Sequence, residues 1–317
     1  MTPHRFESSS IRRRLPGRTE RRGAATGLST PGNFAFGGVF VLVGLAIVLV
    51  GAKIIPVDPK GVHAPYWMLT VCGLVFALAG LVIWGMSWRQ LASEKRQRQL
   101  RSSRPDDLAL ADYAWDPRGF VPSRWGAPAK ALGLAAFLTL FLSIFNWFAF
   151  IENGPVMLKA VIGLFDLAAI WVWCRAGVNM LRAMKFGDSR VEFLKFPYPL
   201  DEPLVVRWWP ATRITHVDQG SFMLRCVKEW HETRGSGDNR STVLIHEEIW
   251  SGIWFLDHAT TFTHLESMEL RCDLPNDAVT TQLTADQPVF WELEVKLALP
   301  GLDFKESYLI PVYEART

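Results

Sequence analysis

Four long apolar runs in the first 185 residues constrain this 317-residue chain more than any other feature of its sequence. A helix rises about 1.5 Å per residue, so it needs roughly 20 apolar residues to cross about 30 Å of hydrocarbon. Three of the runs are uncharged and the fourth is interrupted only by Lys159 and Asp166; such runs are uncommon as buried helices of soluble proteins. We therefore predict four membrane-spanning helices, at residues 34–52, 64–88, 131–151 and 156–174.

The distribution of Lys and Arg predicts how these helices are oriented. Basic residues gather before residue 34 and between residues 89 and 130, whereas the link 53–63 has only Lys53 and Lys60, and the link 152–155 has none. Cationic segments stay on the cytoplasmic side of the membrane during insertion. Both chain ends are therefore predicted to be cytoplasmic.

Charge divides the chain into two chemically different parts. Up to Lys185 there are 22 basic and 10 acidic residues, a net charge of +12, and after it 12 basic and 21 acidic residues, a net charge of −9. We predict a disordered basic tail at residues 1–32, a four-helix membrane region at 33–185 with a cytoplasmic loop at 89–130, and a cytoplasmic domain at 186–317. The aromatic segment 112–120 of the loop is expected to lie at the lipid headgroups or to dock on this domain.

The N-terminal arginines also permit a different reading, an export signal. Three consecutive arginines, Arg12 to Arg14, occur in twin-arginine signals. However, the apolar run begins about twenty residues later, and no small-residue cleavage site follows it. We therefore interpret the first span as retained.

Small residues line one face of each of the first two spans. Because small residues let two helix backbones approach closely, we predict that these spans form a tight hairpin. The alternative is that Gly is simply frequent in membrane helices. The residues concerned are Gly37, Gly44 and Gly51 in the first span, and Gly73, Ala77 and Gly80 in the second.

Two polar residues within the spans are candidate site residues. Asp166 lies about ten residues into the fourth span, where an ionised carboxylate is costly unless it finds water, a partner or a proton. Asn146 of the third span is a candidate neighbour, although its depth does not match well. Asp166 either serves a proton or cation pathway or has a structural role, protonated or paired with Lys159.

The last 130 residues follow a different pattern, in which apolar and polar residues alternate. Residues 290–299 show it most clearly, since period two is typical of a strand with one buried face. Pro300-Gly301 then indicates a turn into a last strand at 304–312, giving a C-terminal hairpin. Several short strands without helical periodicity predict an antiparallel β-sandwich. The other predicted strands are 191–196, 204–208, 222–227, 242–249, 252–255 and 268–274.

Residues 191–313 resemble the end of a family of uncharacterised bacterial multi-pass membrane proteins that carry a domain of unknown function. The resemblance rests on residues 224–227, 245–250, 268–278, 290–295, 300–304 and 310–313, with a weaker echo at 115–119. It implies a bacterial inner membrane and an arrestin-like or immunoglobulin-like C-terminal sandwich. It implies no catalytic residues, and the extracytoplasmic loops are too short for the soluble insert of many such proteins.

No catalytic, metal or cofactor motif is recognised in the sequence. The four cysteines lack C-x-x-C spacing, and Cys226 and Cys272 are expected to be reduced core thiols. Asp257, His258, His264 and Glu266 are more consistent with a solvated loop than with a metal site. The negative charge of the domain opposes nucleic-acid binding.

The pattern is typical of a non-enzymatic membrane protein. We expect a four-helix anchor in the lipid bilayer that presents the β-sandwich for interaction with a partner protein or for self-association. The alternatives are a small transporter, channel or membrane sensor that uses Asp166, and an enzyme whose site is not recognised. Fold alone does not decide among them.

Overall fold

The computed structural model divides the chain into two compact units. The helical unit comprises residues 27–96 and 125–181, and the β unit comprises residues 1–26, 97–124 and 182–317. The structure describes residues 5–10, 12–16, 18, 21–22, 30–57, 65–103, 108–211, 214, 216–235, 240–256, 259–262 and 266–314.

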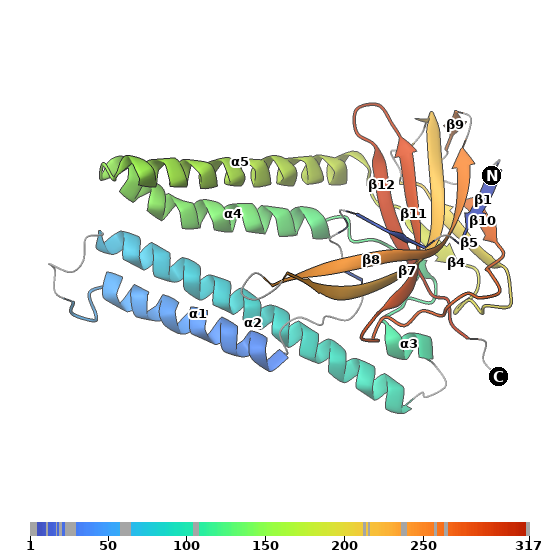
Figure 1. The fold of residues 1–317 in the computed structure, drawn as a ribbon, viewed down its shortest axis with the longest axis horizontal. Helices are drawn as coiled ribbons and strands as arrows, with labels where there is room; N and C mark the ends of the chain where they lie inside the picture. Colours follow the sequence, from blue (N-terminus) through green and yellow to red (C-terminus); the bar gives the residue numbers. More distant parts are fainter. Residues whose placement is uncertain are drawn as a thin grey trace. The chain divides into compact units, whose positions relative to one another are not determined.

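Four helices among the described residues are long and apolar enough to cross a membrane (Figure 1), as the sequence predicts. The second helix continues well past its apolar part, because residues 90–103 are rich in good helix formers. The third of these four helices, α4, is followed directly by a π-helical segment, η2. The helices are α1 (Thr30–Gly51), α2 (Tyr66–Ser103), α4 (Gly126–Asn146) with η2 (Trp147–Ile151), and α5 (Val156–Lys185).

The predicted tight hairpin of α1 and α2 is confirmed by the closeness of their backbones. A Cβ atom added to Gly44 would lie 2.4 Å from the backbone nitrogen of Ala77 and 2.6 Å from the carbonyl oxygen of Gly73. Only glycine fits at this position, because any Cβ atom would collide with backbone atoms of the neighbouring helix. Near the start of α1, Trp84 Nε1 of α2 donates a hydrogen bond of 2.9 Å to the Phe34 carbonyl.

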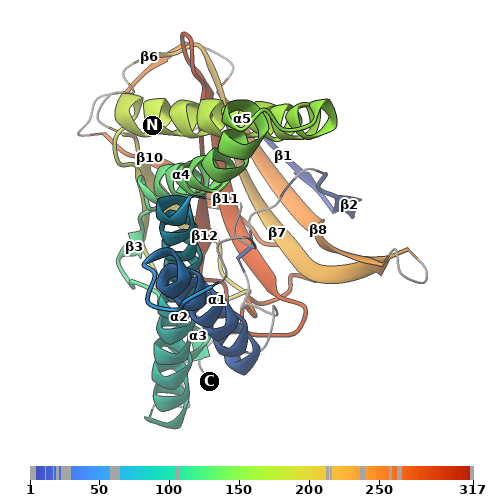
Figure 2. The same ribbon diagram turned by 90° about the vertical axis from the view of Figure 1, so that its left-hand side faces the viewer.

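The β unit contains antiparallel sheets (Figure 2). Within the described residues, the largest sheet has the strand order β1-β8-β7-β11-β12, with β2 also pairing with β8. A second sheet has the order β10-β5-β4-β3, and β6 pairs with β9. The strands are β1 (Arg5–Ser9), β2 (Arg13–Arg14), β3 (Gly119–Phe120), β4 (Arg190–Phe193), β5 (Leu204–Trp209), β6 (His216–Val217), β7 (Gln219–Arg234), β8 (Ser241–Leu256), β9 (Thr260–Thr261), β10 (Met268–Cys272), β11 (Val289–Ala298) and β12 (Phe304–Ile310).

The two larger sheets share a hydrophobic core. Trp208 on β5 is fully buried, and its ring meets Phe222 on β7 edge to face at 5.1 Å between centroids. Its Nε1 donates a hydrogen bond of 3.1 Å to the Tyr308 hydroxyl on β12. Cys226 and Cys272 are free and buried in this core, as expected.

The aromatic part of the connection between α2 and α4 docks on the β unit, which is one of the two placements that the sequence allows. The short helix α3 (Leu108–Asp112) ends with Asp112, whose carboxylate accepts hydrogen bonds from the backbone nitrogens of Leu283 and Thr284 at 2.7 and 2.9 Å. Trp115 is buried, and its Nε1 donates to the Tyr313 hydroxyl at 3.1 Å.

Several strands differ from the sequence-based expectation. The tail, expected to be disordered, forms β1 and β2, which pair with β8. The predicted strands at 242–249 and 252–255 are one continuous strand, β8. Every residue of β11 from Val289 to Val295 is buried, so this strand does not have one exposed face. Glu292 is covered by Arg18 of the tail and by Arg225 of β7, and Glu294 pairs with Arg225, Lys296 and Lys305.

Candidate functional site

The two intramembrane candidates, Asn146 and Asp166, lie in contact. Asn146 Nδ2 donates a hydrogen bond of 2.9 Å to Asp166 Oδ1 and a second one of 3.2 Å to the Leu142 carbonyl. Asp166 lies ten residues into α5, about 15 Å along its axis, whereas Asn146 is five residues from the end of η2. The two side chains are in contact although these distances along the helices differ.

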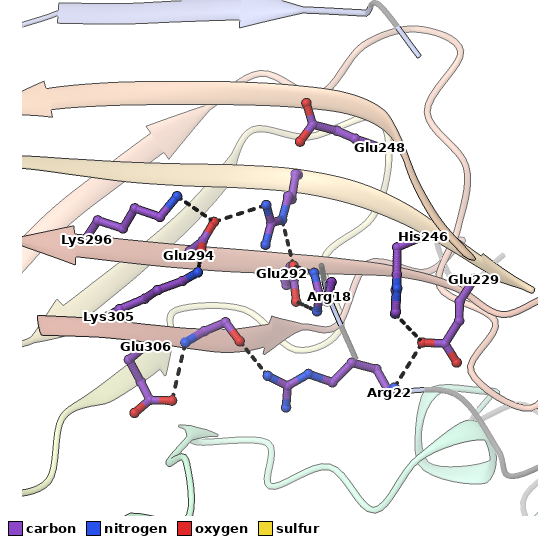
Figure 3. Close-up of polar contacts among 12 residues, drawn as sticks. Arg18, Arg22, Glu229, His246, Glu248, Glu292, Glu294, Lys296, Lys305 and Glu306 are labelled. Atoms are coloured by element: carbon purple, nitrogen blue, oxygen red, sulfur yellow. Dashed lines mark hydrogen bonds and ion pairs between the residues drawn. The ribbon is translucent and has the colours of Figure 1, made fainter. Parts of the chain in front are cut away.

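A second polar cluster, which the sequence analysis missed, lies on the large sheet of the β unit (Figure 3). Four glutamates of β7, β8 and β11 are at most 3% exposed, although glutamate is rarely buried without a partner. We call them the buried glutamates: Glu229, Glu248, Glu292 and Glu294. The same strands contribute one buried guanidinium, that of Arg225.

The strand register brings these side chains together. Glu292 on β11 is the direct partner of Arg225 on β7, and Arg225 Nε lies 2.6 Å from Glu292 Oε1. Arg225 Nη1 also lies 3.0 Å from Glu294 Oε2. Glu229 on β7 is the direct partner of His246 on β8, whose Nε2 lies 3.1 Å from Glu229 Oε2.

The N-terminal segment completes the cluster with arginines. It follows the edge of β8 and then crosses the sheet, since Leu15 N donates to the His246 carbonyl at 2.9 Å and Arg22 Nη2 reaches Ser307 Oγ on β12 at 2.5 Å. Arg18 binds Glu292 through both guanidinium Nη atoms, with Nη2 2.6 Å from Oε2. Such a bidentate ion pair is stronger and more directional than a single hydrogen bond.

Three more contacts join this segment to the buried glutamates. Arg13 Nη2 lies 3.3 Å from Glu248 Oε1. The Arg22 backbone nitrogen donates a hydrogen bond of 3.1 Å to Glu229 Oε2, and Arg21 Nε lies 3.6 Å from Glu229 Oε1. Each of Glu229, Glu248 and Glu292 thus receives at least one arginine of the segment, while Glu294 is held by Arg225, Lys296 and Lys305.

Neighbouring cations and hydrogen-bond donors lower the pKa values of Glu229, Glu292 and Glu294, against the effect of burial. Burial raises the pKa of Glu292, but the hydrogen bond from Arg18 and the charges of Arg225, Arg18 and Arg22 outweigh it and lower that pKa to about 2. The pKa of Glu229 is likewise raised by burial and lowered further by His246 and the Arg22 backbone nitrogen, with a net decrease. Within the described residues, Glu229, Glu248 and Glu292 therefore form an acidic surface that binds arginines of the N-terminal segment.

Sequence reasoning missed the buried glutamates for a specific reason. Glu292 and Glu294 alternate with apolar residues, which is the pattern of a strand with a solvent-facing side, and arginines in a tail before a membrane span are explained as determinants of topology. The sequence does show that the tail is basic and the domain is acidic. This contrast of charge does not specify which arginine pairs with which glutamate.

Among the described residues, no group of three or more His, Cys, Asp or Glu side chains is placed to hold a metal ion. Of the residues considered from the sequence, Asp257, His258 and His264 lie outside the described residues. Burial raises the pKa of the Cys226 thiol to about 12, which makes it a poor nucleophile or metal ligand.

Comparison with known proteins gives similarity to solved structures only. No family model matches the chain, and no curated protein matches it either. Among solved structures, the crystal structure of Spo0M, a sporulation control protein from Bacillus subtilis, is similar to part of the chain with a TM-score of 0.25 and 17% sequence identity. The similarity covers 40% of this chain and 49% of that one, and at this TM-score it carries no argument about fold or function.

Proposed function

We propose that this chain is a membrane-anchored interaction protein of the bacterial inner membrane. Four spanning helices hold it in the bilayer, both chain ends are cytoplasmic, and the β unit is a cytoplasmic β-sandwich. The sandwich binds extended, arginine-bearing protein segments on its buried glutamates. In the chain itself, the N-terminal segment occupies this surface. The observation that carries the proposal is the pairing of the Arg13, Arg18 and Arg21 guanidinium groups with these glutamates, together with the hydrogen bond from the Arg22 backbone nitrogen to Glu229.

The charge balance of the surface supports binding of a basic segment. Without the N-terminal arginines, the described buried side chains of this surface comprise four carboxylates against the single guanidinium of Arg225. Leaving one member of a buried ion pair without its partner is strongly destabilising. The surface therefore needs a cationic occupant, and a partner's arginines satisfy the same carboxylates when the N-terminal segment leaves.

Backbone pairing supports an extended rather than a helical occupant. Strand β1 extends the large sheet at its edge by pairing with β8 from Arg5 opposite Phe255 to Ser9 opposite Ser251. Addition of a strand to a sheet edge is a common way in which proteins recognise peptides, because the backbone supplies affinity and side chains supply specificity.

A competition experiment with the full chain in detergent micelles tests the proposal. The probe is a fluorescent peptide of residues 12–22, and its affinity is measured by anisotropy. In a variant with Arg13, Arg18, Arg21 and Arg22 all changed to Gln, the chain's own segment competes poorly, so the peptide should bind about tenfold more tightly than to the wild type. High salt should weaken this binding.

The matched control is Arg12→Gln, because Arg12 is exposed and makes no ion pair with a described residue. This variant should bind the peptide as the wild type does. A peptide with its arginines replaced by glutamine should not bind. Equal affinity of the original peptide for the wild type and the fourfold variant would refute competition for one surface.

A further inference from the structure

A pocket of about 420 Å³ lies between α4 and α5, beside the Asn146–Asp166 contact. Its polar lining follows α4, since Thr139, Ser143 and Asn146 are spaced by four and three residues and therefore share one face of the helix. Asp166 supplies the lining from α5 and is the only ionisable residue among the described residues of the pocket. The pocket volume is within the range of small-molecule sites in proteins.

The carboxylate of Asp166 has no cation beside it among the described residues. Lys159, the partner considered from the sequence, makes no ion pair with it among these residues. Asn146 satisfies Oδ1, and Oδ2 accepts no hydrogen bond from a described residue. An ionised carboxylate in a spanning helix is costly without a compensating group, so the site favours a positive charge.

The hydrogen-bond donors around the pocket are directed to other acceptors. Ser143 Oγ donates to the Leu140 carbonyl at 2.7 Å, and Thr139 Oγ1 donates to the Ala135 carbonyl at 2.9 Å. Asn146 Nδ2 is committed to Leu142 and Asp166. Thr139 Oγ1 also accepts a hydrogen bond of 2.8 Å from Trp173 Nε1. The groups left for a ligand are the remaining oxygen lone pairs of Ser143, Asn146 and Asp166, which suit a cation rather than an anion.

The remaining lining is aromatic and apolar, with Trp147, Phe150 and Leu142 contributing to it. The Trp147 ring is held in place, because it meets Trp67 edge to face at 5.4 Å and its Nε1 lies 3.3 Å from Glu152 Oε1. Indole and phenyl faces attract organic cations, and more strongly when water is excluded. This lining favours a ligand with an apolar body over a bare inorganic ion.

We infer that the pocket at Asp166 binds a small organic cation, an ammonium group attached to an apolar body. Asp166 neutralises the charge, Asn146 positions the carboxylate, and Trp147 and Phe150 contact the apolar part. This site is independent of the buried glutamates of the β unit, and the inference does not rest on the proposed function.

The test compares a cation with its uncharged carbon isostere on the full chain in lipid nanodiscs. Benzyltrimethylammonium and neopentylbenzene have nearly the same shape, and binding of each is followed by the saturable change that it causes in tryptophan fluorescence. The cation should bind about tenfold more tightly. Asp166→Asn, which keeps the shape of the side chain, should remove that difference, whereas Asp201→Asn, at an exposed position of the β unit, should not.

Further outcomes separate this site from a nonspecific cavity. Equal affinity for both probes would overturn the inference and indicate an apolar cavity alone. Unchanged selectivity in Asp166→Asn would also overturn it. Sodium-dependent stabilisation of the fold without binding of the ammonium would overturn it in favour of an inorganic ion. If Asp166→Asn fails to fold, Trp147→Leu is the second variant, and it should weaken binding of the cation.

Discussion

Arg18 Nη2 lies 2.6 Å from Glu292 Oε2, which joins two residues that are 274 positions apart in the sequence. The side chain of Glu292 is fully buried and that of Arg18 is 13% exposed. An exposed ion pair contributes little to stability, but removing one member of a buried pair leaves an uncompensated charge. This contact therefore couples the N-terminal segment to the stability of the β unit.

The stability of the β unit should fall as the pH is lowered from about 4.5 to about 2. The pKa of Glu292 is depressed to about 2 in the folded chain, so the unfolded chain binds more protons in this interval. Stability rises with pH wherever the unfolded state binds more protons, so acidification removes the contribution of Glu292. The expected loss is about 3 kcal/mol, at about 1.4 kcal/mol per pKa unit.

The loss of stability is measured by thermal unfolding of the detergent-solubilised chain at several pH values. Unfolding of the β unit is followed by far-ultraviolet circular dichroism. Glu292→Gln should be less stable at pH 7, because Arg18 and Arg225 lose their carboxylate. Its stability should also depend less on pH below 4.5. Glu269→Gln is a suitable control, since Glu269 is exposed in β10. An unchanged pH dependence in Glu292→Gln would contradict the assignment.

The spanning helices and the C-terminal hairpin could be predicted because their signals are local. Long apolar runs identify α1, α2, α4 and α5, and strict alternation identifies β11 and β12, whose pairing from Trp291 opposite Ile310 to Leu297 opposite Phe304 is confirmed. Each signal is contained within a short stretch of chain, so it does not depend on tertiary contacts.

The candidate sites could be predicted only in part, because their geometry depends on distant segments. The sequence predicts different depths for Asn146 and Asp166, whereas the structure brings them into contact beside the π-helical segment η2. The pairing of Arg18 with Glu292 depends on the register of β7, β8 and β11, which includes an irregularity between Cys226 and Val227. An isolated arginine or glutamate carries no information about such a partner.

Substitution of Gly44 by Ala should destabilise the α1–α2 hairpin by about 1–3 kcal/mol, as overpacking does elsewhere. The new Cβ would lie 2.4 Å from Ala77 N and 2.6 Å from Gly73 O, so the helices must separate. The measurement is the unfolding temperature in detergent. Gly85→Ala is the matched control in α2, because a Cβ there meets nothing within 4 Å, and it should unfold like the wild type. Equal unfolding temperatures for the two variants would contradict the close contact.

Substitution of Asp112 by Asn should release the connection between α2 and α4 from the β unit. The Asp112 carboxylate accepts hydrogen bonds from the backbone nitrogens of Leu283 and Thr284, from Thr284 Oγ1 at 2.7 Å and from the Tyr313 hydroxyl at 2.9 Å. An amide turns its NH₂ group towards two of these donors, so at least two hydrogen bonds to a charged acceptor are lost. Such bonds contribute about 1.5–3 kcal/mol each, and we expect a loss of at least about 3 kcal/mol.

Limited proteolysis and thermal unfolding together check this prediction about Asp112. Cleavage within residues 113–124 should accelerate in Asp112→Asn. The Asp112 carboxylate orients the Tyr313 hydroxyl, and this hydroxyl accepts the hydrogen bond from Trp115, so the substitution weakens the contact that holds Trp115. Asp116→Asn is the matched control in the same segment, since Asp116 is exposed and its Oδ1 accepts a hydrogen bond from the Arg118 backbone nitrogen at 3.0 Å. If both variants were cleaved at the same rate, the carboxylate of Asp112 would not be what holds this connection on the β unit.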